Sequence, residues 1–304
     1  MHRLGILFCA IVPSVVLLQY GIAKARARWN DLMVWEAFFS GGMATIFVLL
    51  PVMLLKKAFP VDVMSPVHGA VTQAFVIAAI PEEIAKFAAI FFTIKRYGSG
   101  EDRHDMITLS FAVALGFAAI ENLAYLVAPG EWPLLAASRA VLAVPMHGLD
   151  GLAMGSFLAA AQLHPRQRQI WLTAALAVPM LLHAGYDFPL MLFTRNQAFF
   201  GVLPAWFLMV VLSTICVLCL CNKMRASAER AYVPLDGASS PRLIGAVLLL
   251  LVPILAGITL VSAGDFGIVG AAAFTVLPAI LGIDLLCTSS EISPMKIRQK
   301  SQNF

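Results

Sequence analysis

Four stretches of this sequence place ionisable side chains and imidazoles inside otherwise apolar runs. Two imidazoles with two or three carboxylates form a ligand set suited to a zinc-like ion. Such an ion lowers the pKa of a bound water, and a nearby carboxylate takes the proton. The combination predicts a hydrolase whose nucleophile is water. The residues concerned are Glu82, Glu83, Lys86, Glu121, His147 and His183.

Five of these residues are the expected catalytic groups. We assign His147, His183 and Glu121 to the metal, expected to be zinc, or to the water itself. A divalent metal of this kind keeps three protein ligands and one open position in catalytic sites. Glu82 or Glu83 is the expected general base.

Further polar residues are expected to support the catalytic groups. Lys86 lies one helical turn after the paired glutamates, shares their helix face and can keep one carboxylate ionised. Asp150 and Asp187 follow the two histidines at about one turn, so either can orient an imidazole. Arg139 can pair with Glu121 or neutralise excess acid. The supporting set is Lys86, Asn122, Arg139, Asp150 and Asp187.

The elements that must position these residues are membrane spans. Hydrophobic residues make up 60% of the 304-residue chain, charged residues make up 12%, and the mean hydropathy is +0.86. A soluble domain carries about 25% charged residues because it must face water. This composition excludes a cytosolic enzyme and a disordered protein, and it argues against a nucleic-acid partner. It predicts an all-α, polytopic transmembrane helix bundle in a lipid bilayer.

About 20 apolar residues are needed for a helix to cross a bilayer. The first run is expected to stay as a span, because its apolar core of about 19 residues is longer than that of a cleaved signal peptide. The pair Gly41-Gly42 and the small residues around Gly151 and Gly155 are expected to allow close helix packing. We predict nine spans: Gly5–Ala23, Met33–Leu55, Val67–Ile94, Met106–Ala128, Pro133–Ala161, Ile170–Phe193, Phe199–Cys221, Leu243–Ser262 and Phe266–Cys287.

The basic residues set the expected orientation of the spans. Fifteen of the Lys and Arg residues outside the spans fall on one side of the membrane and four on the other. Because Lys and Arg are retained in the cytoplasm, the N-terminus is expected outside and the C-terminus inside. The expected organisation is two N-terminal spans (1–66), a transmembrane catalytic core (67–221), a cytoplasmic linker (222–242), and a C-terminal transmembrane pair with a basic tail (243–304).

This orientation places the ionisable residues of four consecutive spans at similar depth. Glu83, Glu121, His147 and His183 all lie roughly 16–23 Å from the cytoplasmic face, at 1.5 Å per helical residue. Charged groups inside a bilayer are costly and mark function by default. The shared depth predicts that the four side chains converge on one buried pocket.

The order and spacing of these motifs resemble the PrsW family of intramembrane proteases, which is distantly related to CAAX prenyl endopeptidases and bacteriocin-processing enzymes. The resemblance covers about Val67 to Phe193. It rests on Pro81-Glu82-Glu83-x-x-Lys86, Gly116-Phe117-x-x-x-Glu121-Asn122-x-x-Tyr125, Arg139 with His147, and His183-x-x-x-Asp187.

The resemblance implies a membrane metallopeptidase, integral to the bacterial cytoplasmic membrane, that acts on membrane-embedded or membrane-anchored proteins. Family members are associated with site-1 cleavage of anti-sigma factors. In the related prenyl endopeptidases the paired glutamates, matched here by Glu82 and Glu83, activate water, and later polar residues hold that water or the oxyanion. Glu121 and Asp187 replace a histidine and an asparagine of those enzymes, which leaves metal dependence open.

Two other functions could use the same residues. A proton- or ion-coupled transporter can carry a buried layer of carboxylates and imidazoles. A non-catalytic membrane scaffold or immunity-type protein would keep its function after these residues are replaced by alanine.

Overall fold

The computed structural model describes residues 2–24, 31–97, 103–128 and 132–196, together with 206, 210, 211, 213–219, 221 and 222. These residues are mainly helical and contain no β-strand, in agreement with the all-α prediction. The elements are α1 (His2–Lys24), α2 (Asp31–Ala58), η1 (Val61–Val63), α3 (Pro66–Val71), η2 (Thr72–Ala79), α4 (Ile80–Tyr97), α5 (Arg103–Val127), α6 (Trp132–Ser138), η4 (Arg139–Ala143), α7 (Val144–Leu163), η5 (Pro165–Gln167) and α8 (Arg168–Arg195).

Five segments of the described residues are long and apolar enough to cross a membrane. They match the first, second, fourth, fifth and sixth predicted runs. The segments are Leu4–Ile22, Leu32–Val63, Met106–Val127, Pro133–Leu163 and Pro165–Arg195.

The third predicted run, Val67–Ile94, is helical throughout and consists of α3, η2 and α4. Apolar composition alone does not select it as a span, because it contains Glu82, Glu83 and Lys86. Its helical continuity supports the predicted third crossing.

The remaining predicted runs are described little or not at all. The seventh run, Phe199–Cys221, is described at scattered helical positions only, and residues 223–304, with the last two runs and most of the predicted linker, lie outside the described part of the chain. The count of nine spans and the orientation of the termini stay predictions.

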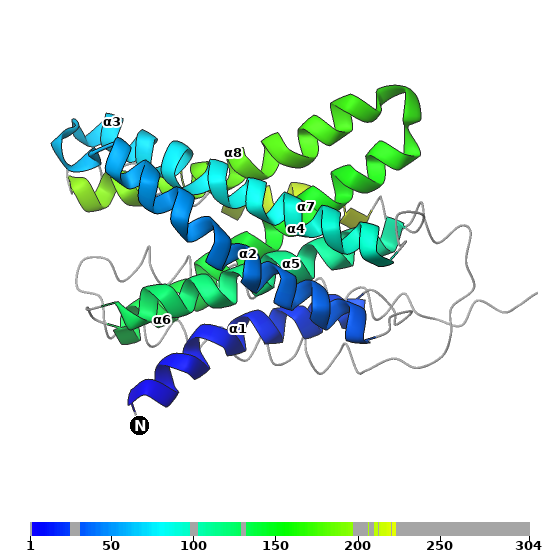
Figure 1. Cartoon of the computed structure of the whole chain (residues 1–304), viewed down its shortest axis with the longest axis horizontal. Coiled ribbons are helices and arrows are strands. Elements are labelled where there is room, and N and C mark those ends of the chain that lie inside the picture. Colours follow the sequence, from blue (N-terminus) through cyan, green and yellow to red (C-terminus); the bar gives the residue numbers. More distant parts are fainter. Residues whose placement is uncertain are drawn as a thin grey trace, which may run out of the picture.

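Helix α5 lies at the centre of the bundle (Figure 1). Its residues 106–119 are all buried, and it packs most extensively against α7 and α2, then against α1. The outer helix α2 instead leaves large apolar side chains exposed, among them Phe39, Phe47 and Leu50. This distribution is the one expected of a bundle whose outer helices face lipid.

Glycines allow the backbones of α5 and its neighbours to come into direct contact. A Cβ atom at Gly116 would lie 1.7 Å from the carbonyl oxygen of Phe38 on α2, and one at Gly41 would lie 1.8 Å from that of Val113. Gly151 on α7 is restricted too, though less severely, with the carbonyl oxygen of Ser110 at 2.7 Å. The predicted close packing at Gly41 and Gly151 is confirmed.

Two π-helical stretches precede residues of the predicted site, and each is followed by a proline. Pro81 comes two residues after η2, and Pro145 comes two residues after η4. Proline lacks an N–H group and its ring clashes with the carbonyl one turn earlier, so a wider turn before it relieves the conflict. The irregular backbone thus lies directly before Glu82 on α4 and His147 on α7.

We expect Gly116→Ala to lower the thermal unfolding midpoint of the detergent-solubilised protein. The added methyl would overlap the α2 backbone, which cannot move aside as a side chain can, at a cost of about 1–3 kcal/mol or more. Gly42→Ala is the matched control, because the nearest atom to its methyl would be a side-chain atom, Ile120 Cγ1, at 3.0 Å, and the nearest backbone atom would lie at 3.6 Å. Equal midpoints for the two variants would contradict the close-packing argument.

Candidate active site

The predicted site residues come from helical segments that meet inside the bundle. They form one buried group, called here the acid–histidine cluster. α4 supplies Glu82, Glu83 and Lys86; α5 supplies Glu121 and Asn122; η4 begins at Arg139; α7 supplies His147 and Asp150; and α8 supplies His183 and Asp187.

Glu83 is the most deeply buried carboxylate of the cluster, with 0% of its surface exposed. Its Oε1 accepts a hydrogen bond from Lys86 Nζ at 2.5 Å and lies 2.7 Å from His183 Nδ1. Lys86 is also buried, at 1% exposed. An unpaired charge at this depth would be strongly destabilising, so the carboxylate and the ammonium compensate each other.

Lys86 also contacts the second histidine. Its Nζ lies 2.8 Å from His147 Nδ1 and 4.7 Å from the centre of the Phe117 ring. The other nitrogen of His147, Nε2, lies 2.6 Å from Glu121 Oε2. The rings of His147 and His183 are 5.4 Å apart and nearly perpendicular. The predicted convergence of Glu83, Glu121 and the two histidines is therefore present in the structure.

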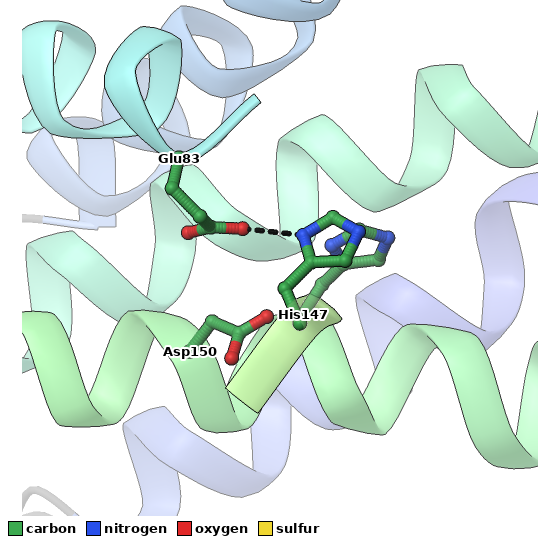
Figure 2. A group of neighbouring side chains, drawn as sticks. Glu83, His147 and Asp150 are labelled. Atoms are coloured by element: carbon green, nitrogen blue, oxygen red, sulfur yellow. Dashed lines mark hydrogen bonds and ion pairs between the residues drawn. The ribbon is translucent and has the colours of Figure 1, made fainter. Parts of the chain in front are cut away.

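Asp150 lies on α7, three residues after His147. Figure 2 shows Asp150, His147 and Glu83 directed toward the same small volume. Asp150 is 1% exposed, and its Oδ1 has no hydrogen-bond partner. It therefore contributes an open carboxylate oxygen to the cluster.

Arg139 lies against Glu121 on the outer side of the cluster. Its Nη2 is 2.8 Å from Glu121 Oε2, and its Nε donates to Asn122 Oδ1 at 2.6 Å. The guanidinium lies over the ring of Tyr125, 4.0 Å from the ring centre. The predicted pairing of Arg139 with Glu121 is confirmed. Tyr125 had no predicted role at the site, although its position one helical turn after Glu121 could have indicated one.

A cavity of about 40 Å³ opens within the cluster. A cavity of this size with polar walls can hold water. Neither Glu83 nor Lys86 lines it. Its polar walls come from Glu82, Glu121, Tyr125, Arg139, His147, Asp150, His183, Tyr186 and Asp187.

Glu82 differs from its neighbour Glu83 in facing this cavity. Its buried Oε2 has no hydrogen-bond partner and lies 3.9 Å from His183 Nε2. The same nitrogen lies 3.4 Å from Asp187 Oδ2, which agrees with the prediction that Asp187 orients an imidazole. Both of the paired glutamates have a buried Oε2 without a hydrogen-bond partner, but of the two only Glu82 lines the cavity, and Glu83 binds Lys86 and His183 through Oε1.

The donor atoms of the cluster fit a cation. Within the described residues, one group of possible ligands contains Glu83, His147, Asp150 and His183, and another contains Glu82, Glu121 and His147. The buried, unpartnered oxygens of Glu82, Glu83 and Asp150 are the atoms that a cation would satisfy. The predicted trio of Glu121, His147 and His183 is divided between the two groups.

Comparison with known proteins places these motifs in a family. Residues 30–216 match the model described as PrsW family intramembrane metalloprotease. Protease PrsW of Halalkalibacterium halodurans is 31% identical over 196 residues, which cover 64% of this chain and 87% of that protein. Protease PrsW of Bacillus subtilis is 30% identical over 186 residues, which cover 60% and 82%. No solved structure matches significantly. These matches confirm the resemblance that the motifs indicated.

We expect Glu83→Gln to lower the unfolding midpoint strongly, because it leaves the Lys86 ammonium buried without its carboxylate, at a cost of about 3–5 kcal/mol. Because Glu82 Oε2 makes no hydrogen bond, Glu82→Gln loses none there. Its unfolding midpoint is expected to lie close to that of the wild type. The unfolding midpoints of both variants are measured by heating the solubilised protein and monitoring the folded fraction by size-exclusion chromatography. If Glu82→Gln were the less stable variant, the assignment of the enclosed and open glutamates would be reversed.

Proposed function

The chain belongs to the PrsW family of intramembrane metalloproteases, and from this premise we propose that it hydrolyses membrane-associated proteins with a water that Glu82 activates in the cavity. The chain is a peptidase and a multi-pass bacterial membrane protein, like the relatives it matches. The family match begins at residue 30 and so includes α2. The division of the chain at residue 66 stays a prediction.

The open carboxylate of Glu82 carries this proposal. A general base must lie within hydrogen-bond reach of the proton it takes. Glu82 Oε2 is buried and unpartnered, and Glu82 lines a cavity large enough for water. Glu83 also has an unpartnered Oε2, but it does not line the cavity and its Oε1 binds Lys86 and His183, so it is the weaker candidate for the base.

The cavity is also lined by residues that carry N–H groups. Arg139 and His147 line the cavity and both contact Glu121 Oε2. Fixed N–H donors in a site that excludes bulk water stabilise the negative charge that develops on a peptide carbonyl oxygen during attack. We assign this charge-stabilising role to Arg139 and His147, with Glu121 holding both in place.

A divalent metal, expected to be zinc, would be held by cavity-lining donors. Asp150, whose Oδ1 is unpartnered, and His183 belong to one possible ligand group, and Glu121 belongs to the other. Both nitrogens of His147 face other side chains, Lys86 and Glu121, so His147 is the weakest ligand of the predicted trio. When bound, such a metal would polarise the carbonyl and acidify water.

The position of the cavity supports a substrate that reaches the membrane interior. Most of its lining residues lie within candidate spans, among them Glu121, His147 and His183. A scissile bond must enter this space, which favours membrane-embedded or membrane-anchored proteins. Anti-sigma factors are the specific class that the family resemblance suggests. The relatives are proteases, so no observation favours the transporter alternative.

We expect Glu82→Gln to abolish cleavage while the protein stays folded, because the amide cannot accept the proton from water. General-base catalysis contributes about 10²–10⁴-fold. Co-expressed single-pass membrane proteins carrying an epitope on each side of the span serve as substrates, and immunoblotting detects the fragments. Glu36→Gln, at an exposed glutamate of α2, is the control expected to cleave normally. Normal cleavage by Glu82→Gln would reject Glu82 as the base.

The metal is tested separately from the base. We expect the purified wild type to hold a divalent metal that His183→Ala loses, measured by elemental mass spectrometry of the detergent-solubilised protein. An equal and negligible content in both would remove the metal from the proposal and would leave water activation by Glu82 intact.

A further inference from the structure

The buried ammonium of Lys86 constrains the chemistry of His147. A lysine ammonium has three N–H donors and no acceptor. Lys86 Nζ donates to Glu83 Oε1 at 2.5 Å and lies 2.8 Å from His147 Nδ1. At that distance Nδ1 must direct its lone pair at the ammonium group of Lys86. If Nδ1 carried a hydrogen, two hydrogen-bond donors would face each other. The proton of the neutral His147 ring is therefore on Nε2.

The other end of the His147 ring agrees with this assignment. Nε2 lies 2.6 Å from Glu121 Oε2, and an ionised carboxylate is an acceptor only. An N–H group at Nε2 therefore donates to Glu121. Arg139 Nη2 lies 2.8 Å from the same oxygen and forms an ion pair with it, without a hydrogen bond.

His183 is connected in the opposite sense. Its Nδ1 lies 2.7 Å from Glu83 Oε1, the same oxygen that accepts from Lys86. Because that oxygen is an acceptor, the proton of His183 is on Nδ1. The remaining nitrogen, Nε2, faces Asp187 Oδ2 at 3.4 Å and Glu82 Oε2 at 3.9 Å. His183 thus directs Nε2, the nitrogen whose protonation is not set by Glu83, toward carboxylate oxygens of the cavity.

We propose that the buried Glu83–Lys86 pair sets opposite hydrogen-bond directions in the two histidines, making His147 a fixed N–H donor and leaving His183 Nε2 as the nitrogen that exchanges a proton or binds a metal. Lys86 is then a positioning residue that acts through His147. The ionised carboxylate of Glu83 and the protonated ammonium of Lys86 together determine the hydrogen-bond direction of both histidine rings.

The consequence for catalysis rests on the proposed function. A ring nitrogen that carries a hydrogen and donates it to Glu121 has no lone pair for a metal, so His147 leaves the predicted ligand set. Its single N–H group would stabilise an oxygen that gains negative charge in the cavity by sharing its hydrogen between that oxygen and Glu121 Oε2. The proton taken from water and returned to the leaving amine would pass by Glu82 and His183.

The hydrogen positions can be measured without any cleavage assay. The full chain is purified in detergent with 15N in both imidazole nitrogens, and long-range 1H–15N spectra report which nitrogen of each ring carries a proton. The chain has six histidines, so His147→Gln and His183→Gln identify the two resonances. We expect His147 with Nδ1 unprotonated and Nε2 protonated, and His183 with Nδ1 protonated.

Variants at Lys86 test the cause. Lys86→Met should release His147, whose spectrum should change to the other tautomer or to a mixture, and Lys86→Arg should keep the wild-type pattern. Lys57→Met, at an exposed lysine of α2, is the matched control and should change nothing. If Lys86→Met does not fold, the wild-type spectrum and Lys86→Arg still decide the question. The same tautomer in both wild-type histidines, or protonated Nδ1 in His147, overturns the proposal.

Cleavage kinetics then separate a positioning role from a structural one. With a peptide-bond substrate that wild type cleaves, Lys86→Met is expected to lower kcat about 10²-fold or more with KM unchanged. Lys86→Arg should recover part of kcat. Opposite tautomers in a chain that cleaves nothing would overturn the proposed function and leave the hydrogen-bond assignment standing. An unchanged kcat in folded Lys86→Met would overturn the role of Lys86 as a positioning residue for catalysis.

Discussion

The ion pair between Glu83 and Lys86 is the interaction on which the site depends. Both residues are almost fully buried among helices that cross an apolar medium, where an unpaired charge is strongly unfavourable. Pairing alone does not use all the hydrogen-bonding capacity of the two groups. The histidines use part of the remaining capacity, since Glu83 reaches His183 on α8 and Lys86 reaches His147 on α7. One charge pair on α4 therefore joins three helices and orients both rings.

The packing of the bundle makes this arrangement possible. α5 contributes Glu121 from the centre of the bundle, and its backbone touches those of α2 and α7 at Gly116 and Gly151. Larger residues at these contacts would separate the helices and move Glu121 away from His147. The π-helical stretches η2 and η4 add a local irregularity directly before Glu82 and His147. Such irregular turns redirect the side chains that follow them, because they change the rotation of the helix at one point.

The cavity combines acidic groups with nitrogen-bearing groups. Glu82, Asp150 and Asp187 line it together with His183, and Arg139 is the one lysine or arginine among the described cavity-lining residues. Arg139 and His147 each bring a nitrogen close to Glu121 Oε2. Groups that accept protons and groups that stabilise negative charge are the two requirements of hydrolysis by water.

The sequence was sufficient for the helical class, for six of the helical segments, and for the residues that meet in the cluster. It was sufficient because apolar composition leaves a membrane helix no alternative to internal hydrogen bonding, and because 1.5 Å per residue converts sequence position into depth. It could not distinguish Glu82 from Glu83, since two adjacent carboxylates are equivalent in composition but point in different directions on a helix. It also could not detect the contact between Lys86 and His147, which are 61 positions apart. Only the rotation of α4 against α7, set by side-chain packing, decided which carboxylate faces the cavity and which nitrogen of each histidine is engaged.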